Sequence, residues 1–384
     1  MQHQLTEAQR GRHEEFKRFV AHDVEPCAEQ WDRDQKIPDS TISKLARCGY
    51  LGSTLPPDYG GRGWDVVTFG LLNEAFGKGS SALTGVLTVQ AMVSMALLKW
   101  GNPEQKREWL PLLATGKTIG AFALTEPGTG SDLHSMATEF THKPTGAGFV
   151  LNGCKKWISC GQFADLFLVF GKLNQRPVAC LVPRNTPGVR IEPICDLMGF
   201  RAAGLAELHF ENVAVPCANL VGKPGFALSH VAPVGLHYGR ISTACSALGL
   251  LRGCFEESAS YAATRRIGDY TVGNLGMIRS LIAGMGTALE AGSLLCHSAC
   301  RAEEEHLPEA FEQTLMAKYF TSRAAVKAAS HAVQIKGAAG CHGSSAVSRY
   351  YRDAKIMEII EGTTQVHEDV LGKMFVDRAG KLRT

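Results

Sequence analysis

The chain changes character at Phe122-Ala123-Leu124-Thr125-Glu126-Pro127-Gly128-Thr129-Gly130-Ser131-Asp132, where a short apolar run ends in a glycine-rich turn. Such a turn exposes main-chain N–H groups and the Ser131 hydroxyl, and these donors suit a phosphate or pyrophosphate. It is not a Rossmann fingerprint, because Leu133 stands where the third glycine would be and no helix of a βαβ unit follows. Taken alone, a segment of this composition is more often only a turn.

Upstream of this stretch, residues 1 to about 120 show helical periodicity. Thr6 and Gln9 form a capping box ahead of an apolar stripe that we expect to stop at Pro26. A single long helical stretch is expected from about 66 to 99. The first part of the chain is therefore interpreted as an N-terminal helical domain.

Downstream, residues 121–225 consist of short β-rich runs separated by Gly, Pro and Asn. No ten-residue helix lies between these runs, which favours an antiparallel barrel or sandwich over a parallel sheet. Helical periodicity returns after Pro224-Gly225 and continues to the end, which predicts a helical bundle over 226–384. The clearest strands are expected at 167–170, 179–182 and 205–215.

The composition is that of an ordinary globular protein. The 384 residues are 45% hydrophobic, and 40 basic against 37 acidic side chains leave a formal charge of +3 without a basic block. This balance argues against nucleic acid or an anionic membrane as a partner. The N-terminal stretch 1–5 runs directly into a charged helix, and no segment is expected to reach the roughly 18 apolar residues of a membrane span. We therefore expect a cytoplasmic protein.

Twelve cysteines are scattered along the chain. In a protein of this kind they are typical of small buried hydrophobic side chains. The segment nearest to a metal cluster is Cys296-His297-Ser298-Ala299-Cys300, whose cysteines lie one helical turn apart, but no second ligand pair accompanies it. Helix packing is expected there, and no metal site is predicted.

One carboxylate near the C-terminus is placed for acid–base chemistry. The stretch Ile359-Ile360-Glu361-Gly362-Thr363-Thr364-Gln365 sets Glu361 between apolar residues and a glycine. Apolar surroundings raise the pKa of a carboxylate and make it a proton acceptor near neutral pH. Gly362 lets a substrate come close to the backbone. Taken alone, a glutamate of this kind is more often a helix cap or part of a solvated face.

A tryptophan follows the glycine-rich turn along the chain. In Asn152-Gly153-Cys154-Lys155-Lys156-Trp157-Ile158-Ser159, the Trp157 ring can pack against a flat aromatic ligand. Alternation along a strand puts the Ser159 hydroxyl on the same face as that ring. The simpler interpretation is a surface strand with one buried tryptophan.

Taken together, these segments resemble the acyl-CoA dehydrogenase family of flavoproteins over residues 40 to 375. Any one motif is weak, but their common order is specific. The segments that carry the resemblance are Tyr59-Gly60-Gly61-Arg62-Gly63, the glycine-rich turn, the Trp157 segment, Arg352-Asp353-Ala354-Lys355-Ile356 and Glu361-Gly362-Thr363.

The resemblance implies a mainly α fold with a central β domain. An N-terminal helical domain (1–120), a middle antiparallel β-barrel-like domain (121–225) and a C-terminal four-helix bundle (226–384) follow one another. FAD is expected between the last two domains, in a homodimer or homotetramer. The implied cofactor-binding residues are Leu124, Thr125, Gly130, Ser131, Trp157, Ser159, Thr363 and Gln365.

The resemblance makes Glu361 the catalytic base. In the family mechanism the thioester carbonyl is bound by an FAD hydroxyl and by the main-chain N–H of Glu361, while the base removes the α proton and hydride passes to the flavin. Arg240 matches an arginine near the thioester arm of the substrate. Substrate contacts are therefore expected at Arg240 and Gly362.

The chain departs from the family pattern at three positions. Thr264 stands where many members have an arginine, and Leu275 where a glutamine is usual. In the family these two positions reach FAD across a subunit interface. His237 stands where an aspartate normally precedes Arg240. We therefore expect altered contacts at the interface and with CoA.

A finer resemblance concerns the substrate. The chain looks like dehydrogenases of polyketide and nonribosomal peptide pathways that act on acyl groups tethered to an acyl carrier protein, including those that make hydroxymalonyl-carrier protein from the 2-hydroxy-3-oxopropionyl form. The segments that carry it are Gly199-Phe200-Arg201-Ala202-Ala203-Gly204, Leu208-His209-Phe210, Tyr238-Gly239-Arg240 and Met357 to Gly362.

Three alternatives stay open at this level. The nearest is α,β-desaturation of a short-chain acyl-CoA. The others are a non-catalytic relative that binds flavin and nucleic acid, disfavoured by the near-neutral charge and by Glu361, and a flavin monooxygenase, which would not need Glu361. The residues name no electron acceptor.

Overall fold

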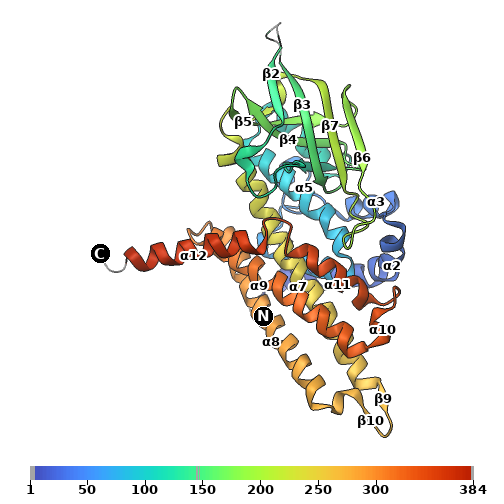
Figure 1. The fold of residues 1–384 in the computed structure, drawn as a ribbon. Helices are drawn as coiled ribbons and strands as arrows, with labels where there is room; N and C mark the ends of the chain where they lie inside the picture. Colours follow the sequence, from blue (N-terminus) through green and yellow to red (C-terminus); the bar gives the residue numbers. More distant parts are fainter. Residues whose placement is uncertain (1–4, 144–145, 147, 382–384) are drawn as a thin grey trace.

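The structure is a computed structural model that describes residues 5–143, 146 and 148–381. The first four residues of the N-terminal stretch lie outside the described residues, as do the last three of the predicted bundle. A β-sheet forms one end of the molecule and a long helical bundle the other, with α12 projecting sideways from their junction (Figure 1).

Helices form the whole N-terminal part, as expected. Thr6 and Gln9 make the predicted capping box. The expectation that the first helix stops at Pro26 is wrong, because α1 runs through a π-helical turn directly into α2. Pro26 lies in the first turn of α2, where its missing N–H leaves no hydrogen bond unmade. The elements are α1 (Glu7–Phe19), η2 (Val20–Val24), α2 (Glu25–Asp34), α3 (Asp39–Cys48), η3 (Pro57–Tyr59), α4 (Val66–Gly79), α5 (Ser81–Trp100) and α6 (Pro103–Ala114).

The single helix expected over 66–99 is two helices. Ser80 interrupts it in an extended conformation (φ −155°, ψ 107°), and its side chain accepts a hydrogen bond from the Leu83 N–H. The second helix, α5, is long and apolar enough to cross a membrane, so the expectation that no segment reaches that composition is wrong. However, 89% of its apolar window is buried inside the protein, which is typical of a core helix.

The sheet has eight strands in the order β6-β7-β3-β2-β4-β5-β8, with β1 paired to β4. Most pairs are antiparallel as expected, but β4 runs parallel to both β1 and β2. The antiparallel expectation is wrong for these pairs because long connections, rather than hairpins, join β1 and β2 to β4. The strands are β1 (Gly120–Ala123), β2 (Glu139–His142), β3 (Phe149–Ile158), β4 (Leu166–Leu173), β5 (Arg176–Pro183), β6 (Val189–Pro193), β7 (Ala206–Val215) and β8 (Leu220–Val221).

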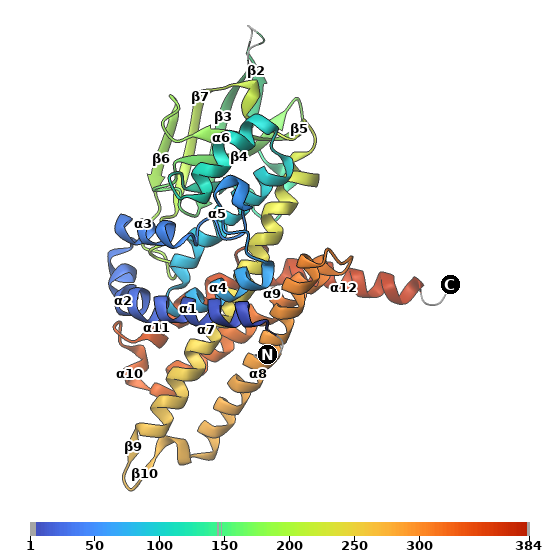
Figure 2. The ribbon, with the colours of Figure 1, turned by 180° about the vertical axis from the view of Figure 1, so that it is seen from behind.

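Helix α7 connects the sheet to the bundle. It contacts α4, α5, α8, α9 and α11, and the view from behind shows α5 and α6 lying over the sheet beside it (Figure 2). Cys296 and Cys300 of α8 are buried beside Cys245 of α7, in agreement with the expected helix packing. The remaining elements are η4 (Leu133–Ser135), η5 (Cys217–Asn219), η6 (Ala227–Val231), α7 (Ala232–Thr264), β9 (Arg266–Ile267), β10 (Tyr270–Thr271), η7 (Val272–Asn274), α8 (Gly276–Glu304), α9 (Ala310–Lys336), α10 (Ala338–Cys341), α11 (Ala346–Met357) and α12 (Thr364–Lys381).

Candidate active site

The glycine-rich turn after β1 is anchored by a buried ion pair that the sequence analysis did not identify. Lys155 of β3 is fully buried, and its Nζ donates to Glu126 Oε1 at 2.7 Å and to the Leu124 carbonyl at 2.9 Å. Glu126 also accepts hydrogen bonds from the N–H groups of Ala137 and Thr138, at 2.6 and 2.9 Å. These bonds fix both ends of the turn to the sheet.

Burial and hydrogen bonding act in opposite directions on the pKa values of Glu126 and Lys155. Burial alone would raise the pKa of Glu126, but the hydrogen bonds from Ala137, Lys155 and Thr138 outweigh it, so the pKa is lowered. Burial lowers the pKa of Lys155 to about 8, against the opposing attraction of Glu126. Both groups are therefore charged at neutral pH, as a satisfied buried pair requires.

The turn itself is open to solvent on its outer side. Gly130 and Ser131 are exposed, and a Cβ added at Gly128 would meet no atom within 4 Å. Within the part of the chain that the structure describes, the N–H groups of Gly130 and Ser131 donate no hydrogen bond. Two main-chain donors and a hydroxyl are thus available to an anion. Thr125, half-buried at the start of the turn, accepts a bond from the Lys156 N–H at 2.9 Å.

Trp157 is presented by an irregularity in β3. The pairing of β3 with β7 shifts between Lys155 and Ile158, and Trp157 has a φ of 62°. Its ring is 50% exposed, so the interpretation as a buried tryptophan is wrong. Ser159 is half-buried and follows the last residue of the strand, so regular alternation does not place it relative to the ring. An exposed indole beside free main-chain donors suits a flat ligand that carries phosphates.

The Glu361 turn between α11 and α12 is held by basic side chains. Glu361 and Gly362 have positive φ values of 56° and 96°. Arg240 Nε of α7 donates to the Glu361 carbonyl at 3.2 Å, and Lys318 Nζ of α9 donates to the Gly362 carbonyl at 2.6 Å. His367 Nε2 lies 3.3 Å from the Glu361 carbonyl. Because a carbonyl only accepts, Nε2 carries the proton in this contact.

The charge states of two of these groups follow from burial. Burial lowers the pKa of Lys318 to about 8, with Glu361 opposing the shift. The pKa of His367 falls to about 3, because burial and the nearby cations Lys318 and Arg240 all disfavour the imidazolium. At neutral pH the Glu361 turn therefore faces two cations and one neutral imidazole.

The Glu361 carboxyl group lies against a glycine of α7. A Cβ added at Gly239 would be 2.4 Å from Glu361 Oε2 and 3.1 Å from Met92 Sδ, so only glycine leaves room for the carboxyl group. Among the described residues Oε2 is buried and has no hydrogen-bond partner. Burial raises the pKa of Glu361 to about 7, although Arg240 and Lys318 pull it down. The carboxylate is thus able to accept a proton at neutral pH.

Helix α7 also connects this carboxylate to the turn after β1. A Cβ added at Gly235 would lie 2.5 Å from the ring of Phe122, the third residue of β1. Gly235 and Gly239 are four residues apart and lie on one helix face. That face therefore receives Phe122 on one turn and Glu361 on the next, which brings the β1 turn and the carboxylate to one region of the molecule.

Two predicted cofactor residues start α12. Thr363 Oγ1 accepts a 3.4 Å bond from the Val366 N–H, and Gln365 is exposed in the first turn. Within the described chain neither residue hydrogen-bonds to the β1 turn or to Trp157. The structure therefore brings Arg240 and Gly362 to Glu361, whereas Thr363 and Gln365 make no hydrogen bond to the other predicted cofactor residues among those described.

The three departures from the family pattern lie at different places. Thr264 is exposed at the end of α7, and Leu275 is half-buried at the start of α8, so both are at the far tip of the bundle beside the β9–β10 hairpin. His237 lies one helical turn before Arg240 on α7. The Nε2 atom of His237 is 2.8 Å from Glu303 Oε2 of α8.

Several residues of this site were not predicted: Glu126, Lys155, Gly239, Lys318 and His367. Two sequence signals existed. Lys155 occupies an inward position of β3, in step with the buried Phe149 and Leu151. The four-residue spacing of Gly235 and Gly239 marks a helix face that meets close neighbours. Lys318 and His367 show no local signal, because their partner is a turn reached only in the folded chain.

Comparison with known proteins shows the family. Models of the acyl-CoA dehydrogenase N-terminal, middle and C-terminal domains match residues 6–117, 121–213 and 229–375. An acyl-CoA dehydrogenase of Bacillus subtilis is 36% identical over 92% of this chain and 94% of its own length. The short-chain specific acyl-CoA dehydrogenase of Rattus norvegicus mitochondria is 33% identical, over 92% of this chain and 86% of its own. The chain belongs to the acyl-CoA dehydrogenase family.

Solved structures agree in fold. FkbI, described as serving biosynthesis of the methoxymalonyl extender unit of a polyketide immunosuppressant, aligns with a TM-score of 0.86 and 29% identity over 95% of this chain and 99% of its own. The prolyl acyl carrier protein oxidase AnaB aligns with a TM-score of 0.91 and 25% identity, over 97% and 99%. Butyryl-CoA dehydrogenase from Megasphaera elsdenii gives 0.93 and 29%, over 97% and 99%.

Members of this family are FAD-dependent, and the chain is accordingly an FAD-dependent dehydrogenase. The residues present fit that cofactor. The exposed Trp157 ring offers a surface for a flavin, and the free donors at Gly130 and Ser131 suit its pyrophosphate. The buried Glu361 Oε2 has no partner within the described protein, as expected for a group whose partner is bound in the site.

Proposed function

We propose that this dehydrogenase oxidises a short acyl thioester carried on an acyl carrier protein, in the biosynthesis of a polyketide or nonribosomal peptide extender unit. The reaction proposed is conversion of the 2-hydroxy-3-oxopropionyl form to hydroxymalonyl-carrier protein. The observation that carries the catalytic part is the Glu361 carboxylate, which is buried, unpaired and has a pKa of about 7.

In this proposal Glu361 is the catalytic base. It removes a hydroxyl proton from the hydrate of the substrate aldehyde, while the hydrogen on carbon leaves as hydride and the C–OH becomes a carboxyl group. FAD, when bound, supplies the hydride acceptor. Arg240 and Lys318 hold the Glu361 turn, and Gly362 leaves space beside it for the substrate.

The Glu361 main chain also has a role. Its N–H donates no hydrogen bond within the described residues, so it is free to bind the thioester carbonyl. A donor that is fixed before the substrate arrives positions the thioester for reaction at the neighbouring aldehyde carbon. The carbonyl of Glu361 is held by Arg240 and His367, which fixes the next peptide group, between Glu361 and Gly362.

The cofactor contacts are proposed from the same geometry. Leu124 and Thr125 lie where the turn leaves β1, and we assign them to the flavin ring together with Trp157 and Ser159. Gly130 and Ser131 are assigned to the pyrophosphate. Thr363 and Gln365 are assigned to FAD from the start of α12. The protein is proposed to be cytoplasmic and a homodimer or homotetramer.

Packing around Glu361 supports a short acyl group. Met92 and Phe122 fill the space beside the two glycines of α7.

Carrier-protein tethering is supported by two observations. His237, which replaces the usual aspartate, points its Nε2 at Glu303 Oε2 of α8 at 2.8 Å, in a contact without hydrogen-bond geometry. FkbI and AnaB, whose names refer to an extender unit and to an acyl carrier protein, match nearly the whole chain. A second candidate is α,β-desaturation of a short-chain acyl-CoA, which the rat short-chain relative and the butyryl-CoA dehydrogenase favour.

The test is anaerobic bleaching of the bound flavin by one acyl group in two forms. The 2-hydroxy-3-oxopropionyl group is offered on a carrier protein and on CoA, with butyryl-CoA as a third substrate. The proposal expects fast bleaching with the carrier-bound form alone. Bleaching by butyryl-CoA alone would replace it with the desaturation account.

A further inference from the structure

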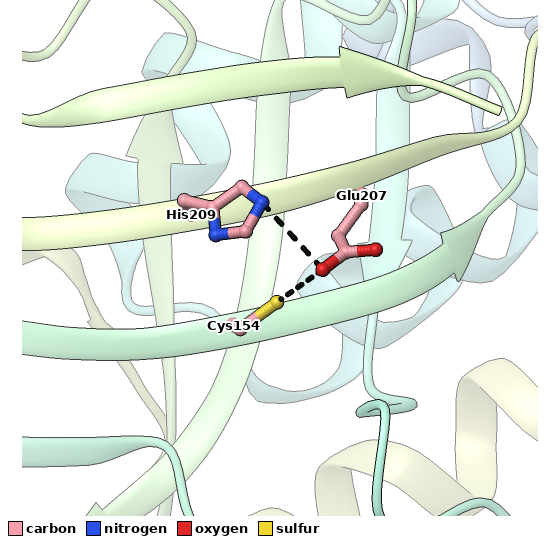
Figure 3. Close-up of side chains that lie close together, drawn as sticks. All are labelled: Cys154, Glu207 and His209. Atoms are coloured by element: carbon pink, nitrogen blue, oxygen red, sulfur yellow. Dashed lines mark hydrogen bonds and ion pairs between the residues drawn. The ribbon is translucent and has the colours of Figure 1, made fainter.

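A second cluster of reactive side chains lies on the outer face of the sheet. Cys154 of β3 is directly opposite His209 of β7, and Glu207 lies two residues before His209 on the same face. Figure 3 shows the thiol and the imidazole both directed at the Glu207 carboxylate. Cys154 Sγ is 3.2 Å from Glu207 Oε1, and His209 Nε2 is 3.5 Å from the same oxygen.

A neighbouring strand adds a fourth group. Glu192 of β6 is opposite Glu207, and its Oε2 lies 3.3 Å from His209 Nε2. Strands β3 and β7 therefore direct a sulfur, a nitrogen and a carboxylate oxygen toward one point, and these three atoms all lie within 4.8 Å of one another. Glu192 contacts His209 but does not belong to this group of three.

These separations match a tetrahedral zinc site. With Zn–S of about 2.3 Å and Zn–N and Zn–O of about 2.0–2.1 Å, tetrahedral angles put ligand atoms roughly 3.3–3.6 Å apart. The S···O and N···O distances of 3.2 and 3.5 Å agree with this to within a few tenths of an ångström.

The surrounding charges leave the ligand atoms free. Lys156 Nζ binds Glu207 Oε2 at 2.7 Å, so the Oε1 atom facing the cluster is not taken by the lysine. Arg190 pairs with Glu192 through Oε1, so its Oε2 faces His209. The two cations balance part of the negative charge of one thiolate and two carboxylates around a divalent ion.

We propose that Cys154, Glu207 and His209 form a Zn²⁺ site, with water as the fourth ligand. Cys154 binds as the thiolate and its proton passes to solvent; nothing is oxidised or reduced. The mixed S, N and O donor set suits zinc over magnesium or calcium, which take oxygen ligands. This revises the expectation of no metal site in the chain.

The position suggests what the ion does. The site joins β7 and β3 beside the pairing shift between Lys155 and Ile158, from which Trp157 projects. A bound ion ties these two strands together at this irregularity and thereby fixes the segment that carries both the buried lysine and the exposed indole. The site is therefore structural rather than catalytic.

The test uses protein that carries FAD and has its cysteines reduced, after a chelator has removed bound metals. Co²⁺ is titrated as a spectroscopic probe of tetrahedral sites, and its d–d bands are followed at wavelengths longer than the flavin absorbs. Zinc affinity is then measured by displacement of Co²⁺. We expect one Co²⁺ per chain, with a thiolate-to-metal band and intense d–d bands.

Variants separate a site from chance binding. Cys154→Ser is expected to remove the thiolate band and weaken zinc binding at least about 100-fold, beyond what loss of an outer partner costs. Cys217→Ser, which changes an exposed cysteine elsewhere in the same domain, is the matched control and should bind as the wild type does. If Cys154→Ser fails to retain FAD, His209→Gln replaces it as the variant that removes a ligand. Absence of stoichiometric Co²⁺ binding in the wild type, or an unchanged spectrum in Cys154→Ser, would overturn the proposal and leave a hydrogen-bonded cluster only.

Discussion

Two glutamates in this protein, Glu126 and the half-buried Glu361, have opposite surroundings. Glu126, below the glycine-rich turn, accepts three hydrogen bonds, one of them from a buried lysine, and its pKa is lowered. Glu361, between α11 and α12, has a buried oxygen without a partner among the described residues, and its pKa is raised to about 7. The same side chain is thus a permanent anion in one region and a group that titrates near neutral pH in the other.

The difference lies in where the cations act. At Glu126 the Lys155 ammonium touches the carboxylate itself. At Glu361 the cations Arg240 and Lys318 bind main-chain carbonyls of the turn and leave the carboxylate oxygens alone. A carboxylate that is satisfied stabilises a fold, whereas one that is positioned but unsatisfied keeps its affinity for a proton.

Removing the charge at Glu361 should abolish the chemistry and keep the cofactor. Glu361→Gln retains the shape of the side chain but cannot accept a proton, so we expect flavin reduction by substrate to fall about 10³–10⁴-fold. The FAD content and visible spectrum should be unchanged. Anaerobic stopped-flow bleaching measures the first quantity, and undiminished bleaching would remove Glu361 as the base.

Removing the charge at Glu126 should have the reverse profile. Glu126→Gln leaves the buried Lys155 ammonium without its counter-ion, which costs about 3–5 kcal/mol of unfolding free energy. We expect a clear fall in melting temperature together with loss of FAD, measured by thermal unfolding and flavin fluorescence. Glu139→Gln, at an exposed position of β2, is the matched control. Equal melting temperatures for the two variants would contradict the structural role.

The stability of Glu361→Gln should depend on pH. The folded pKa of Glu361 is about 7 and the ordinary value is 4.5, so the folded state favours the protonated form. Its contribution to stability is present below pH 4.5 and is lost as the pH rises through 7. The variant has no such loss. The melting temperature of the variant relative to the wild type should therefore be higher at pH 8 than at pH 5. The corresponding change in the difference of unfolding free energy is at most roughly 3 kcal/mol. A difference that does not vary with pH would count against the raised pKa.

Crowding the carboxylate should lower activity without removing the base. In Gly239→Ala the new methyl group would lie 2.4 Å from Glu361 Oε2, so the carboxyl group has to move. A displacement of this order costs about 10²-fold in rate. Gly284→Ala in α8, where a Cβ would meet nothing within 4 Å, is the control for adding alanine to a bundle helix. Steady-state kcat with unchanged FAD content is the measurement, and equal kcat in both variants would contradict the close contact.

The order of helices, sheet and bundle was predictable because long periodic segments carry it. The helix break at Ser80 and the helix continuation through Pro26 were not predictable. A serine can cap a helix or lie within one, and a proline can end a helix or lie in its first turn, so the sequence alone does not distinguish these cases. The parallel pairing of β4 with β1 and β2 also escaped prediction, because it joins segments far apart in the chain.

The candidate site shows the same limit. The expected rise in the pKa of Glu361 is present, but not for the expected reason. Its apolar neighbour Ile359 is 51% exposed, and the carboxyl group packs against Gly239, more than a hundred residues away in sequence. The glutamate could be singled out from its local sequence, whereas the groups that set its proton affinity could be found only in the folded chain.

The contrast between the two glutamates is tested most directly by the pH dependence of anaerobic flavin bleaching in the wild-type enzyme at saturating substrate. Because Glu361 acts in its deprotonated form, the rate should fall about tenfold for each pH unit below an apparent pKa near 7 and level off above it. A rate that stays constant down to pH 5 would mean that Glu361 titrates like an ordinary carboxylate, as a satisfied group does, and would contradict the account.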